Sequence, residues 1–236
     1  MKILAIDTSG PNCSVAITDN NAILADFTIN NGTTHSQNLV PMIEQVQKFT
    51  NIELTDIDAF ACSIGPGSFT GLRIGIATVK GFAMSLNKPT LSVPTLLALA
   101  YNVQNFDGII CSIIDAKNDN VYAGIYRAEH NSLTQVSEYV SDNIDALINN
   151  LKDFDDNIIF VGDGVNTYHD LLLENLNSDF RNVSFAPSHL NYQYAISVAR
   201  AANDMASKND FSDYNSLSPL YLKKSQAERE LDAKSK

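Results

Sequence analysis

Two features of the sequence are typical of nucleotide-binding sites: an aspartate after an apolar strand, and turns rich in glycine. Asp7 ends the apolar segment at residues 2–7, and Gly162-Asp163-Gly164 follows another at residues 158–161. A glycine turn lets a phosphate group approach the backbone closely. Taken alone, Asp7 is explained more simply as a side chain that caps its own turn. A nucleotide site at these residues therefore depends on the elements around them.

The densest group of glycines lies in the stretch CSIGPGSFTGLRIG at residues 62–75, which holds four of the 11 glycines of the chain. A Walker phosphate loop requires Gly, four residues, then Gly-Lys-Ser/Thr, whereas Gly71 is followed by Leu72. The dinucleotide fingerprint Gly-x-Gly-x-x-Gly is missed by one residue, and it belongs to a parallel βαβ unit. The stretch therefore matches neither phosphate-binding motif.

The same glycines have the spacing of one helix face. We predict a helix over residues 70–86, although each interior glycine costs it about 1 kcal/mol relative to alanine. Gly67, Gly71 and Gly75 recur every four residues and so share one face, which Thr78 and Gly81 roughly extend. A face without side chains lets another backbone approach, from the chain's own sheet or from a partner protein. The spacing alone leaves both alternatives open.

The other reactive residues do not form a catalytic or metal-binding set. The three cysteines are scattered without CxxC spacing, which favours reduced thiols over a disulfide frame or a zinc site. His130, His169 and His189 share no ligand spacing, and no Ser-His-Asp or Cys-His set can be assembled. His35 stands at the start of a predicted helix, a place more typical of a cap than of a catalytic base.

Composition narrows the class of protein. The 236 residues carry a formal net charge of −11 with only 16 lysines and arginines. An acidic chain repels nucleic acid at long range, so this one is a poor RNA binder on its own. The hydrophobic content of 44 % supports a packed core. The sequence contains no run of 18 apolar residues, so we predict no membrane span. We expect a cytoplasmic α/β protein.

The predicted elements occur twice along the chain. Three short strands, a helix, a strand and a glycine turn fill residues 2–67, and a similar series fills residues 109–164. This repeat predicts two related lobes. We place the first lobe at residues 1–104 and the second at 105–215, with its last helix packing back on the first. Residues 216–236 are expected to form an extended segment and a flexible tail.

Several motifs together resemble one known family. They are IDTSGPNCSVAI at residues 6–17, HSQNLVPMI at 35–43, GPGSFTGLRIGIATVKGFA at 65–83, IDAKNDNVYAGIY at 114–126, GDG at 162–164 and PLYL at 219–222. They are similar to the bacterial TsaB (YeaZ) family, whose members are partner subunits in making N6-threonylcarbamoyladenosine (t6A) on tRNA. The resemblance spans nearly the whole chain. It implies the actin-like ATPase architecture of two ribonuclease-H-like lobes with mixed sheets and flanking helices.

The catalytic relative TsaD differs from this chain at the residues that matter for chemistry. TsaD carries V-N-H-x-x-x-H, whose two histidines hold a metal, and the matching stretch here is residues 93–99. Thr95 and Leu99 stand where the histidines would be, and leucine offers no lone pair to a metal. In the first turn, Pro11-Asn12 replaces an acidic pair. The resemblance therefore implies a non-catalytic subunit with no metal site and no tightly bound cofactor.

The resemblance also implies partners and a surface. TsaD is the expected heterodimer partner, the ATPase TsaE is expected to join the complex, and a homodimer is expected when the chain is alone. ATP, metal and most tRNA contacts are expected on the partners. The predicted interface consists of His35, Leu39, Met42, Gly67, Thr70, Gly71, Ile74, Gly75 and Thr78. On this prediction, Gly71→Leu would abolish TsaD binding and leave the fold intact.

Two other functions remain open at this point. A phosphotransferase or ATPase of the same fold would use a nucleotide site formed by Asp7, Gly162, Asp163 and Gly164, which the preferred reading treats as vestigial. A metallopeptidase-like protein is the other alternative, and it would require metal ligands that the sequence does not provide.

Overall fold

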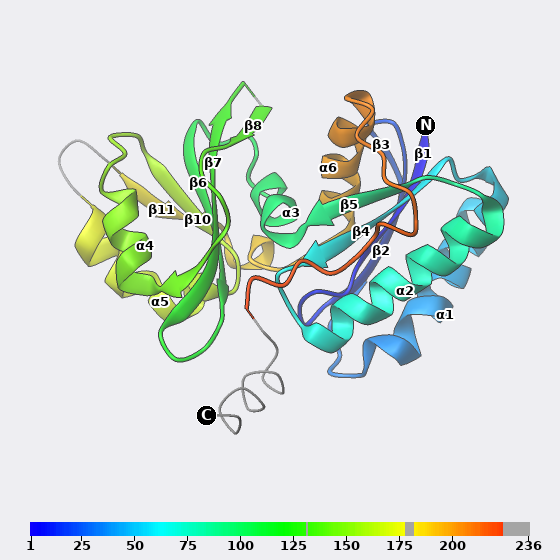
Figure 1. Ribbon diagram of the computed structural model, residues 1–236, viewed down its shortest axis with the longest axis horizontal. Helices are drawn as coiled ribbons and strands as arrows, with labels where there is room; N and C mark the ends of the chain where they lie inside the picture. Colours follow the sequence, from blue (N-terminus) through cyan, green and yellow to red (C-terminus); the bar gives the residue numbers. More distant parts are fainter. Residues whose placement is uncertain (131, 178–181, 224–236) are drawn as a thin grey trace.

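The computed structural model describes residues 1–130, 132–177 and 182–223. Within these ranges the strands form two mixed sheets, one in each half of the molecule (Figure 1). We call the halves the N-lobe, with sheet order β3-β2-β1-β4-β5, and the C-lobe, with sheet order β11-β10-β6-β7-β8. The predicted flexible tail, residues 224–236, lies outside the described residues. None of the described helices is both long and apolar enough to cross a membrane.

The N-lobe sheet opens with the predicted antiparallel meander. Its strands are β1 (Lys2–Asp7), β2 (Cys13–Asp19), β3 (Ala22–Ile29), β4 (Ala59–Gly65) and β5 (Thr90–Pro94). β1 pairs antiparallel with β2 and parallel with β4, which pairs parallel with β5. β2 also pairs antiparallel with β3, so the three short strands predicted here form a meander, and the predicted later strand is β4.

Both faces of the N-lobe sheet are covered, because residues along β1 alternate between two cores. Leu4 and Ile6 pack with α1 (His35–Thr50) and α2 (Phe69–Leu86). Ile3 and Ala5 pack on the opposite face with α6 (Ala195–Ser207). A strand that is buried on both faces has an almost continuous apolar sequence, as β1 does.

The C-lobe repeats this plan with local differences. Its elements are β6 (Gly108–Asp115), β7 (Asn120–Glu129), β8 (Ser132–Gln135), β9 (Val140–Asn143), α4 (Ile144–Leu151), β10 (Ile158–Val161), α5 (Gly164–Leu176) and β11 (Val183–Phe185). The sequence suggests a helix from Ser141 to Leu151. The helix α4 begins at Ile144 instead, because residues 140–143 pair with β7. The Asn143 side chain accepts a hydrogen bond from the Asp145 backbone and caps α4.

The two sheets have the same connectivity, which confirms the internal repeat. The order β2-β1-β4-β5 of the N-lobe corresponds to β7-β6-β10-β11 of the C-lobe, with the same parallel and antiparallel pairings. The glycines at the ends of β4 and β10 also match. Gly65, the last residue of β4, has a φ of 120°, and Gly162, directly after β10, has a φ of 117°. Both positions lie in a region of backbone conformation that favours glycine.

The chain returns to the N-lobe after the C-lobe is complete. α3 (Thr95–Tyr101) links the two sheets, and α6 packs on the N-lobe sheet and on α3. The segment after α6 then crosses the N-lobe again (Figure 1). Its Leu217 is fully buried in the N-lobe core, and the Leu220 amide donates a 2.7 Å hydrogen bond to the Ile64 carbonyl. Residues far apart in sequence therefore complete the first lobe.

The alanines of α6 set how closely this helix approaches the sheet. Ala199 is fully buried against the N-lobe sheet. We expect Ala199→Leu to lower the free energy of unfolding by about 1–3 kcal/mol, because the larger side chain overfills a close-packed contact. Urea denaturation measures this. Ala77→Leu on the exposed face of α2 is the control, with an expected change within about 0.5 kcal/mol. Equal stability of the two variants would contradict the packing described here.

Candidate functional site

The glycine face of α2 is covered by the chain itself. A Cβ atom at Gly71 would overlap the carbonyl oxygen of Thr8, and one at Gly75 would lie 2.5 Å from the Thr8 hydroxyl oxygen. A Cβ at Gly67 would overlap the carbonyl oxygen of Ser9. The Thr8 hydroxyl donates a 2.8 Å hydrogen bond to the Gly71 carbonyl. The missing side chains therefore let the turn between β1 and β2 lie directly on α2.

This contact corrects the prediction that Gly67, Gly71 and Gly75 were left bare for a partner protein. Of the two alternatives that the spacing left open, contact within the chain is the one observed. Gly71→Leu would disturb the fold itself, so the prediction that it spares the fold is wrong.

Leu39 and Met42 are corrected for a related reason. Their side chains are 1 % and 2 % exposed and belong to the core between α1 and the N-lobe sheet. The apolar periodicity that suggested a contact surface marks the buried face of α1.

The other predicted interface residues lie at or near the surface. Thr70 is exposed, while His35, Ile74 and Thr78 are half-buried. His35 Nε2 lies 3.0 Å from the Gly10 carbonyl oxygen, and the Thr78 hydroxyl donates to the Ile74 carbonyl. These four residues stay predictions for an interface.

The predicted interface included only Thr70 from the exposed face of α2. This face, which we call the outer face, consists of Thr70, Arg73, Ala77, Gly81 and Met84. An added Cβ at Gly81 would meet no atom within 4 Å, in contrast to the buried glycines. The signal was present in the sequence, since these residues follow each other at helical spacing opposite the apolar residues Leu72, Ile76 and Val79.

Asp7 is buried at the end of β1. Its Oδ1 accepts hydrogen bonds from the Ser9 backbone amide at 2.8 Å and from the Ser9 hydroxyl at 2.7 Å. Its Oδ2 is buried without a partner in the described residues. Burial raises the pKa of Asp7, and the hydrogen bonds from Ser9 oppose this shift only in part. Asp7 therefore caps its own turn and is not presented to a ligand.

A cleft of about 500 Å³ separates the two lobes next to this turn. The N-lobe contributes Ser9, Gly10 and Ser68, and the C-lobe contributes Asp115, Lys117 and Asp163, among others. Lys117 Nζ lies 2.9 Å from Asp115 Oδ2, and the Asp115 amide donates to Asp163 Oδ1 at 3.1 Å. The charges that face the cleft are thus two carboxylates and one ammonium group.

The pKa values of these carboxyl groups move in opposite directions. Burial raises the pKa of Asp163, and the neighbouring charge of Asp115 adds to this. Burial also acts to raise the pKa of Asp115, but the hydrogen bonds and the charge of Lys117 outweigh it, so the pKa of Asp115 is lowered. Lys117 is therefore committed to Asp115 as its counter-ion.

The residues that line the cleft offer a metal-free phosphate little unpaired positive charge. An incoming phosphate would meet Asp115 and Asp163, while the nearest ammonium is already paired. A Cβ at Gly10 would overlap the side-chain oxygen of Gln193, so this part of the turn is also covered. Gly162 and Gly164 instead serve packing, because a Cβ at either residue would crowd Ile113. We therefore derive no step that involves a bound nucleotide.

The positions that correspond to the histidines of TsaD lie in the protein interior. Thr95 and Leu99 are both fully buried, at the start and near the end of α3. Among the described residues, no group of three or more His, Cys, Asp or Glu side chains is arranged to hold a metal ion. The described residues thus provide no site that favours the metallopeptidase alternative.

The buried and exposed glycines of α2 form a matched pair for a stability test. We expect Gly71→Ala to lower the free energy of unfolding by about 3 kcal/mol or more, because its Cβ would overlap the Thr8 backbone. Gly81→Ala should instead raise it by about 1 kcal/mol, since alanine favours the helix and the added methyl meets nothing. Urea denaturation of both variants measures the difference. Two equal shifts would refute the assignment of the faces.

The buried carboxyl of Asp7 predicts a pH-dependent stability difference. A pKa raised by folding means that the folded state holds the proton more tightly, so stability is lost as pH rises through the folded pKa. Asp7→Asn removes this charge and retains an acceptor for Ser9. We expect the variant to be more stable than the parent near neutral pH, and the gain to shrink as pH falls. Asp153→Asn, at an exposed carboxyl, is the control. A gain that does not change with pH would contradict the burial of a titrating Asp7.

Known families and solved structures with the same fold were found by comparison. The model of the TsaD family, described as tRNA N6-adenosine threonylcarbamoyltransferase, matches residues 23–231. The ROK hexokinase of Thermus thermophilus has a TM-score of 0.55 at 11 % identity and shares the fold alone. The two lobes therefore have the actin-like architecture that the sequence predicted.

Closer relatives share one description, tRNA threonylcarbamoyladenosine biosynthesis protein TsaB. The Bacillus subtilis protein is 28 % identical and aligns over 97 % of this chain and 96 % of its own length. That of Buchnera aphidicola subsp. Schizaphis graminum is 34 % identical over 69 % of this chain and 78 % of its own. The structure of YeaZ from Pseudomonas aeruginosa has a TM-score of 0.76 at 27 % identity, covering 94 % of this chain and 99 % of that one. The chain thus belongs to the TsaB (YeaZ) family, within the wider group that the TsaD model matches.

Proposed function

We propose that this protein is a non-catalytic subunit in the synthesis of t6A on tRNA, and that it binds and activates TsaD. The observation that carries the proposal is the replacement of both metal-binding histidines of TsaD by Thr95 and Leu99, which are buried core residues here. The match of the TsaD model to most of the chain supports it, because two proteins with one fold can pair through equivalent helices. The transfer of the threonylcarbamoyl group to adenosine 37 of tRNA then belongs to TsaD.

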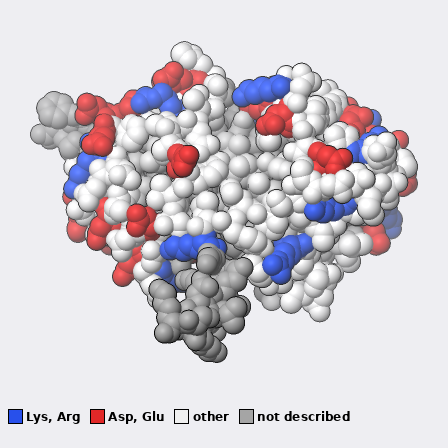
Figure 2. All heavy atoms as spheres, in the orientation of Figure 1, with Lys and Arg blue, Asp and Glu red and all other residues white. Residues whose placement is uncertain are grey.

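The charge distribution supports a role in which partners contact the tRNA. The formal net charge is −11. On the face shown in Figure 2, the basic side chains of the described residues do not form one continuous area. Binding to the phosphate backbone depends on neutralising several phosphates with lysine and arginine. An acidic subunit without a continuous basic tract on this face fits a partner of the tRNA-binding protein better than a direct binder.

The outer face of α2 is the surface we assign to TsaD. Ala77 and Gly81 leave room for a second helix to approach, and Met84, 62 % exposed, provides apolar area. The predicted small-residue contact is thus retained on the side of α2 opposite to the one first proposed.

The other components follow from this assignment. We assign ATP and metal to the partners. For ATP this is supported by the pairing of Lys117, the one ammonium group among the described residues that line the cleft, with Asp115. TsaE joins the complex near the junction with TsaD. Alone, the chain forms a homodimer through the same outer face. Cys13, Cys62 and Cys111 are free and buried, which fits a reducing compartment and hence the cytoplasm.

The test places one large side chain on the outer face. We expect Gly81→Arg to weaken binding to the TsaD of the same organism by about tenfold or more, since the arginine occupies the space needed by the partner helix. The folded state should not suffer, because arginine favours a helix more than glycine does. Size-exclusion chromatography of the co-expressed pair and titration calorimetry measure binding.

Two variants serve as controls for this test. Gly81→Ala removes the glycine without filling the space and should bind TsaD as the parent does. Asn149→Arg adds the same charge at an exposed position of α4 and should also bind normally. Full TsaD binding by Gly81→Arg would show that the outer face is not the interface. In vitro t6A formation by TsaD and the other components without this chain, at an undiminished rate, would refute the activating role.

A further inference from the structure

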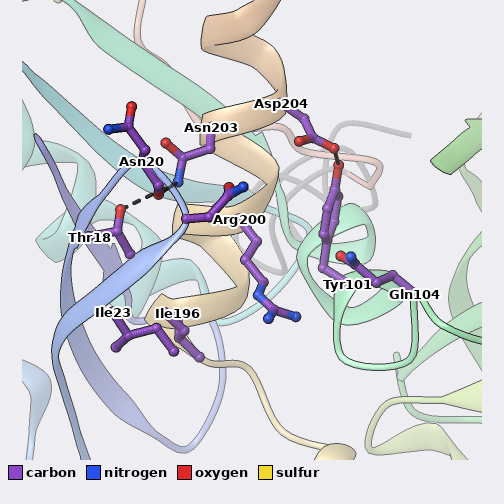
Figure 3. Close-up of a pocket in the computed structure, with 10 residues that line it drawn as sticks. Thr18, Asn20, Ile23, Tyr101, Gln104, Ile196, Arg200, Asn203 and Asp204 are labelled. Carbon is purple, nitrogen blue, oxygen red and sulfur yellow. Dashed lines mark hydrogen bonds between the residues drawn. The ribbon is translucent and has the colours of Figure 1, made fainter. Parts of the chain in front are cut away.

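A second concave site lies away from the outer face of α2. It is a pocket of about 300 Å³ between the turn that joins β2 to β3, the helix α3 and the helix α6 (Figure 3). α6 covers the face of the N-lobe sheet opposite to α1 and α2. A partner on the outer face of α2 would therefore leave this pocket open.

The pocket contains a cation with no partner in the described residues. Arg200 of α6 is exposed and makes no hydrogen bond or ion pair within them. Its natural partner would be Asp204, one helical turn later. Asp204 Oδ2 instead accepts a hydrogen bond of 2.5 Å from the Tyr101 hydroxyl. Figure 3 shows the guanidinium pointing away from Asp204, so the planar donor fork of Arg200 is left free.

The pocket also contains an acceptor with no donor. Gln104 Oε1, at the end of the pocket near Tyr101, is buried and has no hydrogen-bond partner in the described part of the chain. A buried acceptor without a donor is unfavourable, and a bound donor group would relieve it. Arg200 therefore favours a negatively charged group of a ligand, whereas Gln104 favours a hydrogen-bond donor.

The remaining walls are apolar or fixed. Ile23 and Ile196 form an apolar side of the pocket. The Asn203 amide nitrogen donates to the Asn20 carbonyl at 2.8 Å and lies 3.4 Å from the Thr18 hydroxyl oxygen, which ties the turn to α6. The pocket is thus built by contacts within the chain. Its volume is at the lower end for ligand sites, which favours a small molecule.

We propose that this pocket binds a small aliphatic zwitterion of the free amino acid class. The carboxylate would pair with the Arg200 fork, which matches carboxylate geometry. The ammonium group would donate to Gln104 Oε1, and the aliphatic part would lie against Ile23 and Ile196. One cation, one unpartnered acceptor and an apolar wall together match such a molecule, whereas a simple anion would use only Arg200.

Three probes of similar shape test this assignment on the full chain. L-valine carries both charged groups, 3-methylbutanoate lacks the ammonium, and isobutylamine lacks the carboxylate. We expect L-valine to bind at least about tenfold more tightly than either of the others, as measured by titration calorimetry and saturation-transfer NMR. Arg200→Gln should weaken L-valine binding by about tenfold or more, whereas Lys152→Gln, the same charge change on an exposed residue elsewhere, should not. Gln104→Met should weaken L-valine and leave 3-methylbutanoate unchanged.

Several results would overturn the proposal. Equal binding of L-valine and 3-methylbutanoate would show an anion site with no role for Gln104. L-valine binding that is unchanged in Arg200→Gln would place the ligand elsewhere, and absence of binding by all three probes would refute the site. Arg200 is exposed, so a circular dichroism spectrum and melting temperature like those of the parent are expected and make the binding comparison valid.

Discussion

The contact between α2 and the turn that follows β1 is the constraint on which the N-lobe depends. Thr8 and Ser9 lie on the backbone of α2 where Gly67, Gly71 and Gly75 have no side chains. The Ser68 amide donates to the Ser9 carbonyl at 2.7 Å, which adds a hydrogen bond to the close approach. Any side chain on this face would push the helix away from the sheet, so the glycines are required by packing even though each weakens the helix.

This constraint decides which surfaces remain for other molecules. With its glycine face against the turn, α2 can present only its outer face, where Ala77 and Gly81 are exposed. The same contact holds Asp7 in the interior at the end of β1, with Ser9 folded over it. The residue that a nucleotide-binding relative of this fold would be expected to use is thus enclosed.

The internal repeat shows how one plan was adapted differently in the two halves. The strands β4 and β10 lead into glycines of positive φ, Gly65 and Gly162, and each glycine passes close to another part of the backbone. In the N-lobe the following helix meets the turn through a glycine face. In the C-lobe, Asp163 instead accepts a hydrogen bond from Asp115, and Lys117 pairs with Asp115. The C-lobe side of the cleft therefore carries charged side chains, whereas on the N-lobe side the turn after β1 lies against α2.

The sequence by itself determined the N-lobe strands, β6, β7, β10, most helices and the repeat, because apolar periodicity and glycine turns are local signals. The strands β8, β9 and β11 and the helix α5 were missed. The start of α4 was also missed, because residues 140–143 form β9 by pairing with β7. The sequence could not decide which neighbour filled the space beside Gly71, or that Leu39 and Met42 were core residues. Only the tertiary structure decided this, because spacing defines a helix face and only packing shows what lies against it.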